Sequence, residues 1–133
     1  MDLSDRIKDE MIVEDSTILE SEFDRVKELL DLHEDGTINL SSKARDLDAE
    51  LQILVYFIGR RFAYEGELVD EPLLNSSFVY TRVDKSDRTV RNYLQKLRES
   101  GYLSKENQSK HELLVENLPD ALNEIEAAIG GDA

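Results

Sequence analysis

Residues 86–103 read SDRTVRNYLQKLRESGYL, and the spacing of their apolar side chains predicts a helix with one buried face. Ser86 is a favoured N-cap residue, and Gly101 stands where a residue in the left-handed conformation commonly ends a helix. The apolar side chains recur at i, i+3, i+4 and i+7, which places them on one side of the helix: Val90, Tyr93, Leu94 and Leu97.

The opposite side of this helix is polar and basic, in a chain whose formal net charge is −14. The window 82–111 contains eight basic and four acidic residues, whereas the rest of the chain contains 8 basic and 26 acidic residues. The window therefore has a net charge of +4 and the remainder −18. This asymmetry favours an anionic partner for the window.

The residues on either side of this helix complete a recognisable pattern. A short helix is expected to begin at Ser76 or Ser77 and to end at Arg82, and the tight connection VDKS then leads to the second helix. Downstream, we expect two short strands, Tyr102-Leu103 and Glu112–Val115, joined by a polar loop. A short helix, a tight turn and a longer helix form a helix-turn-helix, and the hairpin after it would form a wing.

The span from about residue 47 to 117 resembles a winged helix-turn-helix domain, in particular the small acidic regulators of haloarchaea. Three stretches carry the resemblance: ELQILVYFIGRRFAYEG (50–66) as a buried first helix, DKSDRTVRNYLQKLRESGYL (84–103) as turn and recognition helix, and SKENQSKHELLVEN (104–117) as wing. The resemblance implies a mainly α fold with a small β-hairpin wing (α+β), with additional N- and C-terminal helices.

The same resemblance implies a sequence-specific DNA-binding transcriptional regulator, with the recognition helix in the major groove and the wing on the backbone or minor groove of double-stranded DNA. The candidate residues of the recognition helix are Lys85, Ser86, Arg88, Thr89, Arg91, Asn92, Gln95 and Lys96. The candidate residues of the wing are Lys105, Asn107, Gln108 and Lys110. Two alternatives stay open: a winged-helix module that docks a protein through its acidic surface, and a basic helix face that is merely solvated.

The remaining sequence divides into flanking segments at residues 1–45 and 118–133, around a domain at 46–117. In the first segment we expect helices at 4–13 and 17–33, the second with a capping box at Thr17 and Glu20, and a short strand at 37–40. Residues 68–77 are expected to form a loop.

The C-terminal segment is expected to form a helix from near Pro119, a residue type favoured in the first turn. Leu122, Ile125 and Ile129 form an apolar stripe on this helix. Regulators of the resembled type commonly dimerise through helices outside the winged domain, so the resemblance implies a homodimer with these three residues as the candidate interface. The alternative is that this helix and the helix at 17–33 pack on the same monomer.

Several classes of protein are disfavoured. The chain has no cysteine, its two histidines, His33 and His111, are far apart in the sequence, and no glycine loop could cradle a phosphate, so we expect no enzyme activity and no cofactor. Asp31, His33 and Asp35 match part of an EF-hand loop, but the twelfth position is Ser42 where a glutamate is needed, so no metal site is expected.

The acidic residues are spread along the chain outside the basic window. This spread favours the surface acidity of a halophile's protein, from an archaeon or one of its viruses, over a disordered acidic tail or a nucleic-acid mimic. No apolar run approaches the roughly 20 residues of a membrane span, and the sequence MDLSDRIKDE does not resemble a signal peptide, so a cytoplasmic protein is expected.

Overall fold

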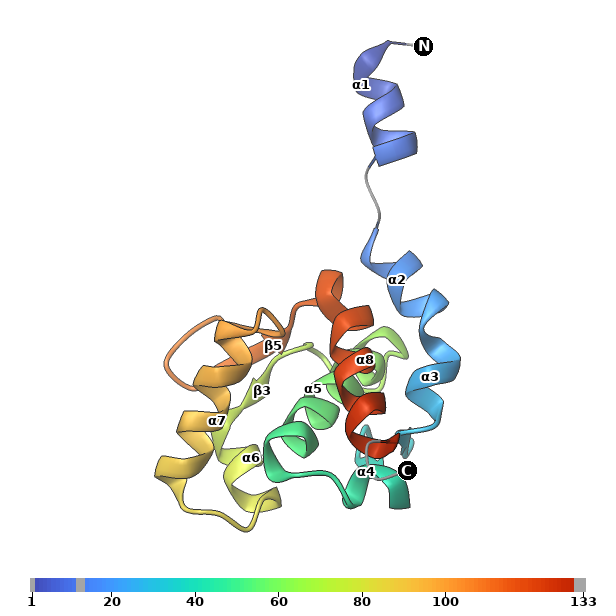
Figure 1. Cartoon of the computed structure of the whole chain (residues 1–133). Helices are drawn as coiled ribbons and strands as arrows, with labels where there is room; N and C mark the ends of the chain where they lie inside the picture. The colour runs from blue at the N-terminus through green and yellow to red at the C-terminus, as the bar shows by residue number, and fades with distance from the viewer. Residues whose placement is uncertain (1, 12–13, 131–133) are drawn as a thin grey trace.

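The computed structural model describes residues 2–11 and 14–130, which form helices and two small antiparallel sheets (Figure 1). The first elements in chain order are α1 (Leu3–Arg6), the π-helical turn η1 (Ile7–Met11), α2 (Asp15–Ser21), α3 (Phe23–Lys27), β1 (Leu30–Leu32), β2 (Ile38–Leu40) and α4 (Ser42–Arg45). They are followed by α5 (Ala49–Glu65), β3 (Leu74–Asn75), α6 (Ser76–Arg82), α7 (Asp87–Glu99), β4 (Leu103–Lys105), β5 (Lys110–Leu113), the 3₁₀ turn η2 (Val115–Asn117) and α8 (Leu118–Gly130). The expected α+β class is confirmed.

Helix α5 occupies the centre of the molecule because its sequence is apolar on nearly every side. It contacts α7 and β5 on one side and β1, β2 and α8 on others. Gly59 allows the close approach of β2, since a Cβ at this position would lie 2.8 Å from Cγ2 of Ile38. The buried residues of α5 are Ile53, Leu54, Val55, Phe57, Ile58, Gly59 and Ala63.

Helices α6 and α7 are joined by a tight turn at residues 83–86, as the sequence predicts. Ser86 is the N-cap of α7, because its hydroxyl accepts a hydrogen bond from the Thr89 amide at 3.2 Å. Gly101 follows α7 with a φ of +84°, and its carbonyl accepts a hydrogen bond from the Asn117 side chain at 2.6 Å. Both predicted ends of this helix are confirmed.

The three-stranded sheet has the order β3-β5-β4 and is antiparallel throughout. Leu103 pairs with Leu113, and Leu74 pairs with His111. The prediction of a loop throughout residues 68–77 is wrong at β3, where a buried Leu74 and an exposed Asn75 are too few residues to show the alternation of a strand.

The hairpin β4–β5 also differs from its prediction, because its strands continue further toward the turn. The Asn107 side chain accepts hydrogen bonds from the amides of Ser109 and Lys110, each at 3.0 Å, and the Glu106 amide donates to the Lys110 carbonyl. These bonds close a tight turn, so the strands end at Lys105 and begin again at Lys110.

The single helix predicted at residues 17–33 is wrong. The chain departs from helical geometry at Glu22, between α2 and α3, and leaves the helix after Lys27 to form β1. The helix also begins earlier than predicted, so that the Thr17 amide donates to the Glu14 carbonyl and no capping box forms. A strand is favoured here because the β1–β2 hairpin buries Leu30 and its partner Leu40 in the common core.

The turn between β1 and β2 explains the residues that resemble a calcium loop. The Asp35 carboxylate accepts a hydrogen bond from the Thr37 amide at 2.9 Å, and Gly36 has a φ of +89°. The His33 amide donates to the Thr37 carbonyl at 2.9 Å. Within residues 2–11 and 14–130, no cluster of three or more histidine, aspartate or glutamate side chains could hold a metal ion.

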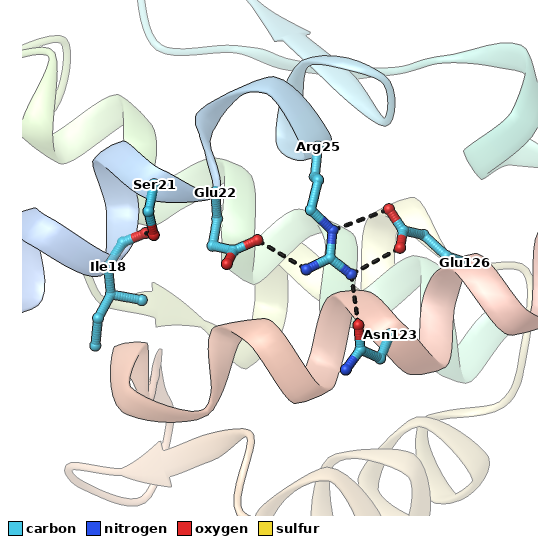
Figure 2. Close-up of polar contacts among 6 residues, drawn as sticks. All are labelled: Ile18, Ser21, Glu22, Arg25, Asn123 and Glu126. Atoms are coloured by element: carbon cyan, nitrogen blue, oxygen red, sulfur yellow. Dashed lines mark hydrogen bonds and ion pairs between the residues drawn. The ribbon is translucent and has the colours of Figure 1, made fainter.

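An arginine connects the N-terminal elements to the C-terminal helix (Figure 2). Arg25 of α3 makes two hydrogen bonds to the Glu126 carboxylate of α8, at 2.7 and 3.0 Å, and one to Asn123 at 2.7 Å. It also donates to Glu22 at 2.8 Å. These hydrogen bonds lower the pKa of Glu126 and raise that of Arg25, so both groups are charged at neutral pH.

The residues predicted to form a dimer interface instead belong largely to the core of the monomer. Leu122 and Ile125 are completely buried, and Ile129 is partly buried against the same core. Leu122 and Ile125 are not free to meet a second chain, because α8 packs them into the core. A homodimer stays a prediction.

The three predicted segments share one hydrophobic cluster, which includes Leu19 of α2, Phe57 of α5, Leu94 of α7 and Ile125 of α8. Residues 4–11 of the helix predicted at 4–13 lie in α1 and η1, which have no buried residue, and residues 12 and 13 lie outside the described part of the chain. No helix in the described part of the chain is both long and apolar enough to cross a membrane.

The burial of α8 predicts that two of its isoleucines contribute differently to the free energy of unfolding. Ile125→Ala should lower the free energy of unfolding by about 2–5 kcal/mol, because it leaves a cavity in the core, and Ile129→Ala should cost less. Urea denaturation at two protein concentrations measures both effects. If the loss at Ile125 depended on protein concentration, this residue would belong to an interface between chains and the description of the core would be wrong.

Candidate nucleic-acid interface

Helix α7 presents its polar side to solvent, because its apolar stripe is buried against the core. Val90, Leu94 and Leu97 are buried and Tyr93 is partly buried beside them, so at about 100° per residue the polar side chains between them point outward. The predicted residues that are exposed are Lys85, Ser86, Arg88, Arg91, Asn92, Gln95 and Lys96. The structure thus brings seven of the eight predicted helix residues to one exposed region at the turn and on α7, and the eighth, Thr89, is partly buried.

Two of the predicted helix residues, Ser86 and Thr89, have a structural role. The Ser86 hydroxyl accepts a hydrogen bond from the Thr89 amide and donates one to the Thr89 hydroxyl at 2.9 Å. Both side chains are therefore engaged in capping the first turn of α7. Gln95 is exposed, and its amide donates to the Glu99 carboxylate at 3.1 Å.

In the hairpin β4–β5, which is the predicted wing and is called the wing below, two of the four candidate side chains bond within the protein. Lys105 and Gln108 are exposed, whereas the Asn107 side chain holds the turn together. Lys110 forms an ion pair with Glu71 at 2.7 Å, so its charge is neutralised by the loop that follows α5. Its role as a DNA-binding residue stays a prediction, and contact with a phosphate would have to compete with this ion pair.

Most basic residues of the window 82–111 form no ion pair with the described residues. Of its eight basic residues only Lys110 forms an ion pair within the part of the chain that the structure describes. Outside the window, four of the eight basic residues are each paired with at least one carboxylate, namely Arg6, Arg25, Lys43 and Arg61. The seven unpaired residues of the window are Arg82, Lys85, Arg88, Arg91, Lys96, Arg98 and Lys105.

A pocket of about 310 Å³ lies where α6, α7 and the wing meet, and we call it the basic pocket. Arg91 and Arg98 reach it from α7, two turns apart on one face of the helix, and Lys105 reaches it from β4. Ser76 at the start of α6 also lines it, and no aspartate or glutamate does. The pocket therefore has three positive charges that no carboxylate within it opposes.

His111 contributes to the wall of the basic pocket from β5 and is only 2% exposed. Arg98 donates a hydrogen bond to its Nε2 atom at 2.8 Å, so the proton of the neutral ring is on Nδ1, which has no partner among the described residues. Burial, together with the positive charges of Arg98 and Lys105, lowers the pKa of His111 to about 4. The ring is therefore neutral at pH 7.

Sequence reasoning did not select Arg98, His111, Ser76 or Tyr80, all of which line the pocket. One signal for Arg98 was available, since it follows Arg91 by seven residues and so shares its face of the helix. The place of His111 depends on the pairing of β5 with β3 and β4, which no local pattern reveals.

Comparison with known proteins identifies no similar protein. No family model matches the chain, and neither the curated proteins nor the solved structures contain a match.

The low pKa of His111 predicts a contribution to acid sensitivity. The unfolded chain has a histidine with its usual pKa of 6.5, whereas the folded chain keeps the ring neutral down to about pH 4. The contribution to the free energy of unfolding is therefore complete above pH 6.5 and falls as the pH drops from 6.5 toward 4.

In His111→Gln the side-chain oxygen can still accept a hydrogen bond from Arg98, but the group no longer titrates. The stability of the native protein relative to this variant should decline between pH 7 and pH 5, as measured by urea denaturation at each pH. Parallel stability curves for the two proteins would show that His111 titrates normally in the folded state.

Proposed function

We propose that this chain is a winged-helix DNA-binding protein that regulates transcription. The order of its elements supports the proposal: a buried helix (α5), a strand (β3), two helices joined by a tight turn (α6 and α7) and a hairpin (β4–β5). The first strand pairs with the last, so the sheet ties the wing to the base of the helix pair. This is the arrangement in which a second helix is presented for docking in a groove.

The observation that carries the proposal is the set of seven unpaired basic residues in the window 82–111. DNA has about one negative charge per 1.7 Å of helix axis, and a protein neutralises it with basic groups on its docking surface. A chain with 30 acidic residues could readily pair its arginines internally, as it does at Arg25 and Arg61. In the window 82–111 these positive charges stay available for an anionic partner such as DNA.

The side chains at the start of α7 are of the types that distinguish bases. An α-helix about 10–12 Å across fits the major groove of B-DNA, which is about 12 Å wide. Arginine can bind the edge of guanine through two hydrogen bonds, and asparagine can do the same for adenine. Arg88, Arg91 and Asn92 are exposed in the first half of the helix and are the proposed base-reading residues.

The acidic remainder of the surface fits a protein that works in concentrated salt. Outside the window the net charge is −18, which in dilute buffer would repel DNA over a Debye length of about 10 Å or more. At about 1 M salt that length falls to about 3 Å, so distant repulsion is screened while direct contacts persist. We propose a halophilic archaeal or viral origin and action in the cytoplasm.

Removal of two base-reading arginines tests the proposed function. Arg88→Ala combined with Arg91→Ala should weaken binding to a selected DNA site about tenfold or more, because loss of a bidentate base contact costs about 1–3 kcal/mol. Folding should be unaffected, since both side chains are exposed. Fragments selected from genomic DNA supply the site, and a gel-shift titration in molar potassium chloride measures the affinity.

The matched control is Lys43→Ala combined with Arg45→Ala. It removes the same charge from α4, which lies away from α7 (Figure 1). DNA affinity of the control should equal that of the native protein. Equal losses in both double variants would mean that net charge alone matters, and no loss in either would exclude α7 from the interface.

The charge distribution also predicts an unusual dependence on salt. Most DNA-binding proteins lose affinity steeply as salt rises, because binding releases counterions. Here, screening of the acidic surface should offset that loss, so affinity should change little or increase toward molar potassium chloride. A titration of one DNA site across this range measures the slope, and circular dichroism checks folding at each point. A fall as steep as that of a basic regulator would contradict the proposed role of the acidic surface.

A further inference from the structure

Two arginines of this chain are anchored in chemically different ways. Arg25 is bonded to the carboxylates of Glu126 and Glu22, which cancel its charge (Figure 2). Arg98 is bonded to His111 Nε2, a neutral acceptor, at 2.8 Å. Its guanidinium group is thereby held in place while its charge stays uncompensated, and one anchoring bond leaves most of its five N–H donors for other partners.

The other polar groups in the basic pocket are also suited to bind an anion. Arg91 and Lys105 add two exposed positive charges, and neither forms an ion pair among the described residues. The amides of Asn92 and Gln108 can donate hydrogen bonds to a ligand, and the Ser76 hydroxyl can accept one. The Ser76 hydroxyl at present donates to the Ser109 carbonyl at 3.1 Å, so it already joins α6 to the wing.

We propose that the basic pocket binds a phosphate group. Guanidinium groups match the geometry of phosphate oxygens through paired hydrogen bonds, and bonds between charged partners are about twice as strong as neutral ones. The volume of about 310 Å³ lies at the lower end of the range for ligand sites, which suits one phosphate and the group that bears it. The bearer is either a small phosphorylated molecule or the backbone of a nucleic acid.

This site goes beyond the proposed function, because it can bind phosphate without any duplex. The pocket is built from three elements, and its arginine is prepositioned by a buried side chain, so it does not depend on a surface that forms only against DNA. Phosphate binding can therefore be measured in the absence of DNA, and its failure is distinguishable from failure of the DNA-binding proposal.

The experiment is a titration of the full chain with inorganic phosphate at pH 7.5, with chloride exchanged for phosphate at constant ionic strength. Side-chain NMR signals of the arginines, asparagines and glutamines should shift saturably for the groups in the pocket. Arg91→Gln combined with Lys105→Gln should weaken the apparent affinity by at least about tenfold, through loss of charged hydrogen bonds. Both side chains are exposed, so this variant should fold normally.

The control variant, Lys43→Gln combined with Arg45→Gln, has the same change in charge outside the pocket and should bind phosphate like the native protein. Linear, unsaturable shifts, or equal weakening in both variants, would overturn the proposal. A last measurement identifies the kind of molecule to which the bound phosphate group belongs. Because Arg91 belongs to both proposals, this measurement uses Lys105→Gln alone. Weaker binding of both phosphate and duplex DNA would assign the pocket to the nucleic-acid backbone, and weaker binding of phosphate alone would assign it to a small phosphorylated molecule.

Discussion

The burial of α5 on nearly every side determines where the other elements lie. A helix of this kind must be covered all round, and α7, the two sheets and α8 provide that cover. Figure 1 shows α7 and the strand β5 on one side of α5, with α3 and α8 on the other. Since α7 meets α5 through its apolar stripe, its basic face has to point to solvent. The candidate interface is thus a consequence of how the core is packed.

Charge pairing divides the surface into two kinds of region. On the side of α3 and α8, Arg25 is surrounded by carboxylates and joins two elements that are distant in the sequence. On the side of α7 and the wing, the same residue type is kept free, and Arg98 is positioned by a neutral histidine. A buried neutral partner orients an arginine without cancelling its field, which suits a site for an anion better than a site that only stabilises the fold.

Local chemistry explains which features the sequence predicts correctly. Helix α7 combines a long amphipathic period with Ser86 and Gly101 at its ends, so each signal supports the others. By contrast, β1 begins in an apolar run that fits a helix or a strand equally well, and β3 is too short to show any period. The contact of Arg98 with His111 depends on strand register across the sheet, and the burial of Ile125 depends on packing between the ends of the chain.

The most direct test of the central claim is to locate the DNA-contacting residues on the folded protein. Labelled protein titrated with a duplex in molar potassium chloride should show backbone amide shifts confined to α7, the turn before it and the tip of the wing. Amides of α8 and of the hairpin β1–β2 should stay unchanged, because they lie outside the unpaired basic region. Shifts spread over the acidic surface, or saturable binding with no change in α7, would contradict the account.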